Sequence, residues 1–248
     1  MEKEILELKK KFNEISRMGF VKSINKGYGG IGRTFEDLIG IKYNKSEEPD
    51  FLGIEIKTKR LCSRRDITLF ASKPEGPSIN QIEIIKKKYG YPHKIHKNYR
   101  ILNASADSIQ LNKVGLFRYF KLRVDRQKGK IFLEVYNTKR ELIDDETYWT
   151  IENLEQKVTK KLKVLALITA LSQRVNGVEY FKYYDFRIYH LKTNKFIDLI
   201  ESGIIRINLK IGVYLTGAMT GKTYDRGTSF EINEDNLEYL FEKCPKYE

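Results

Sequence analysis

Three residues in segment 49–57 carry side chains that could support metal-dependent hydrolysis. Asp50 is followed after four residues by Glu55, and Lys57 comes two residues later. Residues two apart on a strand point to the same face of a sheet, so Glu55 and Lys57 would emerge together. Carboxylate and carbonyl oxygens are the ligands that Mg²⁺ prefers. The spacing therefore predicts a Mg²⁺ site at Asp50 and Glu55, with a lysine beside it.

A charged, solvated strand edge is the alternative explanation for the same three residues. The acid-x-lysine pattern also recurs at Glu155 and Lys157, with acidic residues upstream. That second match lies in an expected helix, where residues two apart diverge by about 200° and cannot share a face. Only the first match can bring its charged side chains together.

The segment that must position Glu55 and Lys57 is predicted to be a strand over residues 51–60. Leu52, Ile54 and Ile56 alternate with charged or polar residues along it. This alternation predicts an apolar face that packs into the core and thereby fixes the charged face opposite.

Helical and extended patterns follow one another along the chain. Apolar residues recurring at three and four predict helices, and alternation between turn residues predicts strands. The expected helices span 2–18, 34–39, 78–89, 154–174 and 196–201. The expected strands span 41–44, 51–60, 66–71, 116–124 and 130–136, and tyrosine-rich strands with glycine-punctuated hairpins follow residue 177. These patterns predict a mixed α/β (α+β) fold with a lobe boundary near residue 175.

The charge balance points to a polyanionic partner. The 248 residues carry a formal net charge of +13, which favours binding to nucleic acid because phosphate neutralisation releases counterions. All of the excess lies in residues 1–175, which carry a net charge of +14, and residues 176–248 carry −1. The charged N-terminus resembles no secretory signal, and no apolar run approaches the about 20 residues that span a bilayer. We therefore expect a cytoplasmic protein without a membrane segment.

The acidic motif, preceded by Glu36 on a short helix, resembles the PD-(D/E)xK nucleases of the MvaI/BcnI/MutH branch. Within that branch the similarity is greatest to restriction enzymes of the MvaI type, and it covers most of the chain. It implies a restriction-endonuclease-like core and two lobes around a DNA cleft, with residues 1–175 catalytic and residues 176–248 recognising DNA. It also implies a monomer that binds double-stranded DNA and uses Mg²⁺.

The resemblance further implies the active-site residues and the target. The catalytic residues would be Glu36, Asp50, Glu55 and Lys57, of which the three acids would be metal ligands. MvaI-type enzymes cut both strands of CC(A/T)GG after the second cytosine. No residue in the sequence decides between an A/T and a G/C central pair.

Base-reading side chains are expected in the second lobe, where arginine or lysine can pair with guanine in the major groove. Polar residues alternate with isoleucine and leucine over residues 205–211, although a solvated strand edge would show the same pattern. Segment 224–232 resembles the family's base-reading stretch and contains an acid that could accept from cytosine. The candidates are Arg206, Asn208, Lys210, Asp225 and Arg226.

Three functions remain open at this stage. The first is a type II restriction endonuclease, and the second is a MutH-like repair nickase of the same fold. The third is a DNA-binding module without catalysis. They differ in whether both strands, one strand or neither is cut.

Overall fold

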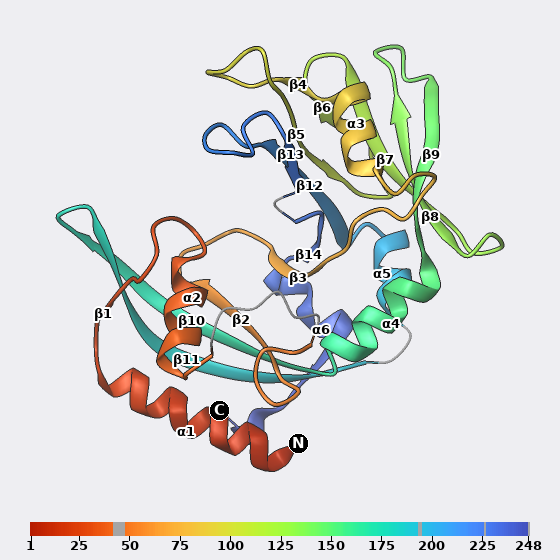
Figure 1. Ribbon diagram of the computed structural model, residues 1–248. Helices are drawn as coiled ribbons and strands as arrows, with labels where there is room; N and C mark the ends of the chain where they lie inside the picture. The colour runs from red at the N-terminus through yellow and green to blue at the C-terminus, as the bar shows by residue number, and fades with distance from the viewer. Residues whose placement is uncertain (42–47, 193–194, 226, 248) are drawn as a thin grey trace. The chain divides into compact units, whose positions relative to one another are not determined.

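The computed structural model describes residues 1–41, 48–192, 195–225 and 227–247 (Figure 1). Helices and several sheets combine in a mixed α/β fold, as expected. The chain forms two compact units. The first unit comprises residues 1–67, 157–193 and 237–248, and the second comprises 68–156 and 194–236.

This division differs from the expected boundary near residue 175. Residue 175 is the last residue of one strand, and the strand that begins at Val178 pairs antiparallel with it. Both strands belong to the first unit. The reason is that the long hairpin pairs along its whole length, which holds the residues on both sides of the expected boundary in one sheet.

The first unit is built on one mixed sheet. Its strands are β1 (Val21–Lys22), β2 (Glu55–Arg60), β10 (Val164–Val175), β11 (Val178–Leu191) and β15 (Phe241–Lys243). Its helical segments are α1 (Glu2–Arg17), α2 (Gly30–Leu38), α6 (Leu237–Leu240) and η2 (Pro245–Tyr247). The strand order is β1-β11-β10-β2, with β15 paired to β11. Strand β10 runs parallel to β2 and antiparallel to β11.

The core of the first unit lies on one face of this sheet. Alternate residues of β10, namely Ala166, Ile168 and Ala170, are buried in one cluster with residues of α1 and α2. Ile54 and Ile56 belong to the same cluster. The opposite face of β2 therefore carries Glu55 and Lys57, the expected catalytic pair.

The expected helix over residues 154–174 is wrong. Helix α4 (Ile151–Lys161) ends early, and the apolar run that follows forms β10. Residues 164–170 are all buried, because β10 is an interior strand between β2 and β11. A strand covered on both faces needs no polar alternation, so its apolar run resembles a buried helix in sequence.

Two further boundaries differ from expectation. Helix α2 begins at Gly30, four residues before the expected start at residue 34. A Cβ atom at Gly30 would lie 2.6 Å from the hydroxyl of Ser23, so this position suits glycine. Strand β2 begins at Glu55 because Phe51 and Ile54 close a tight turn through two mutual backbone hydrogen bonds. Leu52 lies at the tip of that turn and is 58% exposed, so it is not part of the core face. The expected strand 41–44 lies almost wholly outside the described residues.

Within its described residues, the second unit contains two sheets and the helices α3 and α5. One sheet has the order β3-β14-β12-β5-β4, with β13 paired to β12, and the other has the order β6-β7-β8-β9. The first sheet contains β3 (Ile67–Ala71), β4 (Tyr91–Pro92), β5 (Arg100–Ala106), β12 (Ile205–Val213), β13 (Thr223–Asp225) and β14 (Ser229–Ile232). The other contains β6 (Asn112–Val114), β7 (Arg118–Asp125), β8 (Lys130–Tyr136) and β9 (Leu142–Thr150). The helices are α3 (Gln81–Tyr89) and α5 (Phe196–Glu201), and η1 (Glu234–Asn236) follows β14.

Several expectations for this unit are confirmed. Strands β7 and β8 pair as the expected hairpin, and α5 and β3 lie where the sequence patterns place them. Helix α3 ends at Tyr89 as expected but begins at Gln81, three residues after the expected start at Ser78. Strand β12 alternates between buried and more exposed residues along its full length. It lies between β14 and β5, so its polar face is held by neighbours on both sides.

Candidate active site

Strand β2 brings Glu55 and Lys57 together on one face. The Lys57 ammonium lies 2.6 Å from Oε1 of Glu55 and donates a hydrogen bond to it. Glu55 is buried and Lys57 is half-buried. Ile54 and Ile56 pack into the core on the other face, which prevents the strand from rotating. The expected pairing of the two charged side chains is thus present in the structure.

Asp50 reaches the beginning of the same strand through the turn that precedes it. Its Oδ2 accepts a hydrogen bond of 2.9 Å from the backbone N–H of Ile56. This bond holds the carboxylate beside the backbone of Glu55. The negative charge of Asp50 is close enough to act on the pKa values of both Glu55 and Glu36.

Glu36 projects from the C-terminal half of α2 and is half-buried. It accepts a hydrogen bond of 3.3 Å from Arg33, one turn earlier on the helix. Burial raises the pKa of Glu36, and the charge of Asp50 raises it further, while Arg33 and Lys57 act in the opposite direction. The charges of Asp50 and Lys57 are thus near enough to act on the pKa of Glu36.

Glu55 is the most deeply buried of these acids. Burial raises its pKa, Lys57 opposes that shift, and the charge of Asp50 adds to it. Its second oxygen, Oε2, is buried and accepts no hydrogen bond. A buried carboxylate oxygen without a hydrogen bond, beside a second carboxylate, fits a hard divalent cation, which takes oxygen ligands. In the described ranges no three Asp, Glu, His or Cys side chains are grouped closely enough to hold a metal ion. Lys57 donates a hydrogen bond to one oxygen of Glu55, and the backbone N–H of Ile56 donates to one oxygen of Asp50.

A polar network covers part of the sheet formed by β5, β12 and β14. The amide of Asn208 donates to Oε2 of Glu231 and accepts from the hydroxyl of Ser105. Lys210 lies 2.6 Å from Oε1 of Glu231, and Ser229 donates to the same oxygen. Burial alone would raise the pKa of Glu231, but the hydrogen bonds from Lys210, Ser229 and Asn208 outweigh it, so the pKa is lowered.

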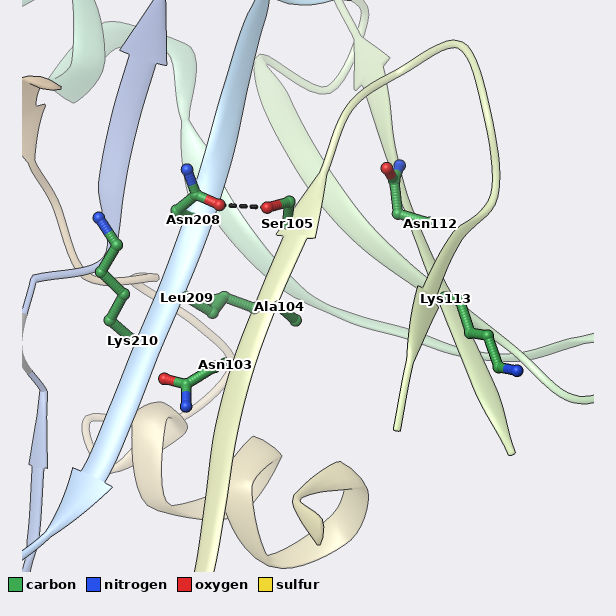
Figure 2. Close-up of a pocket in the computed structure, with 8 residues that line it drawn as sticks. All are labelled: Asn103, Ala104, Ser105, Asn112, Lys113, Asn208, Leu209 and Lys210. Atoms are coloured by element: carbon green, nitrogen blue, oxygen red, sulfur yellow. Dashed lines mark hydrogen bonds between the residues drawn. The ribbon is translucent and has the colours of Figure 1, made fainter. Parts of the chain in front are cut away.

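This network borders a pocket of about 360 Å³ between β5 and β12 of this sheet and β6 of the other sheet (Figure 2). Six of its eight lining residues are polar, and they come from β5, β6 and β12: Asn103, Ala104, Ser105, Asn112, Lys113, Asn208, Leu209 and Lys210. Figure 2 shows Asn208 and Lys210 as neighbours along β12, with Asn208 turned toward Ser105. Two of the expected base-reading residues therefore line one concave, polar surface.

The other expected base-reading residues are placed differently. Arg206 is exposed on the same strand as Asn208. Both oxygens of Asp225 accept hydrogen bonds within its own turn, from the N–H of Gly227 and the hydroxyl of Thr228. Arg226 lies outside the described residues.

Sequence reasoning did not single out two residues that the structure places at these sites. Lys161, at the end of α4, lies 3.6 Å from Oε2 of Glu55. Glu231, at the centre of the network on β14, is buried and accepts hydrogen bonds from four polar side chains, those of Thr68, Asn208, Lys210 and Ser229. A carboxylate in a strand of otherwise buried residues was a signal for Glu231, whereas Lys161 fell within the incorrectly expected long helix.

The model of the MvaI/BcnI restriction endonuclease family matches residues 9–241. The chain belongs to this family. Among solved structures, a complex of restriction endonuclease MvaI with its cognate DNA substrate is 30% identical to the chain, with a TM-score of 0.90. A structure of MvaI in the absence of DNA is 29% identical, with a TM-score of 0.61. Each similarity covers 98% of this chain and 98% of the other. No curated protein matches.

Membership of this restriction endonuclease family establishes the protein as a nuclease that binds DNA. The expected family resemblance and the expected fold are both confirmed. None of the helices in the described part of the chain has the length and apolar character needed to cross a membrane.

Proposed function

We propose that the protein is a Mg²⁺-dependent type II restriction endonuclease that cuts both strands of a short pseudopalindromic DNA site. The observation that carries this proposal is the buried Glu55 paired with Lys57 on β2, beside Asp50. Family membership supports nuclease chemistry and the use of a divalent metal. Oε2 of Glu55, a buried oxygen that accepts no hydrogen bond, supports the choice of a hard cation.

Asp50 and Glu55 would hold Mg²⁺, and Glu36 would bind a second ion or anchor Lys57. Mg²⁺ bound there would polarise the scissile phosphate and lower the pKa of a water molecule. Lys57 orients the attacking water, and its ammonium offsets the charge that develops on the non-bridging phosphate oxygen. The apolar face of β2 supports this chemistry by keeping both side chains in place.

Recognition of the site is assigned to the second unit. Arg206, Asn208 and Lys210 share one face of β12, and Asp225 with Arg226 completes the proposed base-reading set. Arginine and lysine suit guanine, and an asparagine amide suits adenine. Because the chain is similar to MvaI over nearly its whole length, we propose CC(A/T)GG as the target, with cleavage after the second cytosine. We also propose that the enzyme acts as a monomer.

The test is to incubate the purified protein with unmethylated plasmid and Mg²⁺ and to sequence the fragment ends. Double-strand ends at CC(A/T)GG support the whole proposal, and ends at a site with a G/C central pair correct only the target. Nicks confined to one strand would favour a repair nickase. Sequence-specific binding without cleavage at any Mg²⁺ concentration would favour a non-catalytic DNA-binding module.

A further inference from the structure

Lys161 is a second ammonium at the buried carboxylate of Glu55. Its Nζ lies 3.6 Å from Oε2, the oxygen that accepts no hydrogen bond. Lys57 lies 2.6 Å from the other oxygen, Oε1. The side chain of Lys161 is only 21% exposed and that of Glu55 is 2% exposed. One buried carboxylate is thus flanked by two positively charged groups.

The fold places Lys161 there through the end of α4 and the start of β10. The helix ends at Lys161, and β10 begins three residues later at Val164. Because β10 pairs in parallel with β2, Leu165 lies opposite Glu55. A lysine in the last turn of a helix is also favoured by the helix dipole. Lys161 is therefore held beside the first residue of β2 by backbone pairing.

The contact between Lys161 and Glu55 is electrostatic. A separation of 3.6 Å is too long for a hydrogen bond, and partial burial reduces the screening of the two charges. A divalent cation that takes Oε2 as a ligand must approach the same oxygen that Lys161 faces. Two positive groups at one oxygen repel each other, so they compete for it.

We propose that Lys161 is a positioning residue that holds Oε2 of Glu55 in the metal-free enzyme and competes with the divalent cation for that oxygen. The inference rests on the proposed function, in which Glu55 is a metal ligand. Lys57 does not compete in this way, because it contacts the other oxygen, Oε1, and can stay there while Oε2 binds a cation. Cation binding thus requires the Lys161 ammonium to move away from Glu55, while Lys57 remains.

The test is a Mn²⁺ titration of the DNA-free, full-length protein at pH 8, with the free ion measured by electron paramagnetic resonance. Lys161→Met should bind Mn²⁺ about three- to tenfold more tightly than the wild type, because one competing charge is gone. Lys161→Arg keeps the charge and should restore an affinity close to that of the wild type. The matched control is Lys160→Met, which removes the ammonium of the preceding residue. The side chain of Lys160 is 51% exposed and pairs with the exposed Glu48 rather than with Glu55.

The outcomes separate this inference from the proposed function. Glu55→Gln should weaken Mn²⁺ binding by about tenfold or more, because it removes a charged ligand. If Glu55→Gln has no effect, Glu55 is not a ligand, and both the proposed metal site and the role of Lys161 fail. If Glu55→Gln weakens binding but Lys161→Met does not tighten it, only the role of Lys161 is overturned. Circular dichroism verifies folding, and Lys161→Gln replaces the methionine variant should the latter not fold.

Discussion

The ammonium of Lys57 lies 2.6 Å from Oε1 of Glu55, and both side chains leave the same face of β2. The pair forms because residues two apart on a strand share a face, and because the residues between and before them are buried on the other side. Burying a carboxylate without a partner costs free energy, and the ion pair with Lys57 offsets part of that cost for Glu55. The arrangement fixes the carboxylate of Glu55 in a position where it could bind a cation.

Loss of either member of this pair should abolish cleavage while leaving DNA binding largely intact. Glu55→Gln removes a proposed metal ligand, and Lys57→Met removes the group that orients water, so each should reduce the rate by about 100-fold or more. Cleavage is measured on plasmid with Mg²⁺, and binding by gel shift with Ca²⁺. Lys10→Met, a change of equal charge at an exposed position of α1, should cleave like the wild type. Full activity in the Glu55 or Lys57 variant would refute the assignment.

Arg206→Ala should relax recognition at one base pair of the target. If Arg206 contacts a base edge, its loss should cost about 1–3 kcal/mol for the cognate base and little for the others. Binding is measured against a panel of duplexes that differ from the target by one base pair. Lys139→Ala, at an exposed turn of the second unit, is the control. A uniform loss of affinity across the panel would instead indicate that Arg206 contacts phosphate.

The stabilising effect of Glu231 should depend on pH. Its pKa is lowered in the folded protein, because hydrogen bonds from Lys210, Ser229 and Asn208 outweigh the effect of burial. Its contribution is therefore present above the pKa of the unfolded state and is lost as the pH falls through the folded pKa. Glu231→Gln should lower the free energy of unfolding by about 1–3 kcal/mol at pH 7, and by less as the pH approaches 4.

Urea unfolding at pH 7, 5 and 4 checks this expectation. Trp149 packs edge-on against Phe230, the residue before Glu231, so its fluorescence reports on this part of the second unit. Thr68→Val is a suitable comparison, since it removes the longer contact of 3.3 Å to Glu231 but leaves the carboxylate charged. A difference between wild type and Glu231→Gln that grows with acidity would contradict the predicted direction.

Arg60→Met should destabilise the first unit. The guanidinium donates to both carboxylate oxygens of Glu179, at 2.7 and 2.9 Å, and to the backbone carbonyl of Tyr28 at 3.0 Å. Its removal leaves a partly buried carboxylate without that partner, which should cost about 1–2 kcal/mol of unfolding free energy. Thermal and urea unfolding provide the measurement. Arg64→Met, at an exposed position after β2, should stay within about 0.5 kcal/mol of the wild type.

Patterns within a short stretch of sequence were sufficient for much of the fold. The helix at 2–18, the β7–β8 hairpin and the alternation of β12 are all confirmed, because each depends on neighbours within a few residues. The helix expected over 154–174 was wrong for the opposite reason. An apolar run covered on both faces has the same appearance in a central strand and in a buried helix, and only its position in the sheet separates them.

The juxtaposition of Glu55 and Lys57 follows from strand geometry, so the sequence alone predicts it. The contact of Lys161 with Glu55 depends on the parallel pairing of β10 with β2, two segments more than 100 residues apart in the chain. The partners of Glu231 likewise come from β12 and β3 as well as its own strand. Pairings over such distances are set by how the strands assemble and leave no local pattern, which is why the tertiary structure was needed to reveal them.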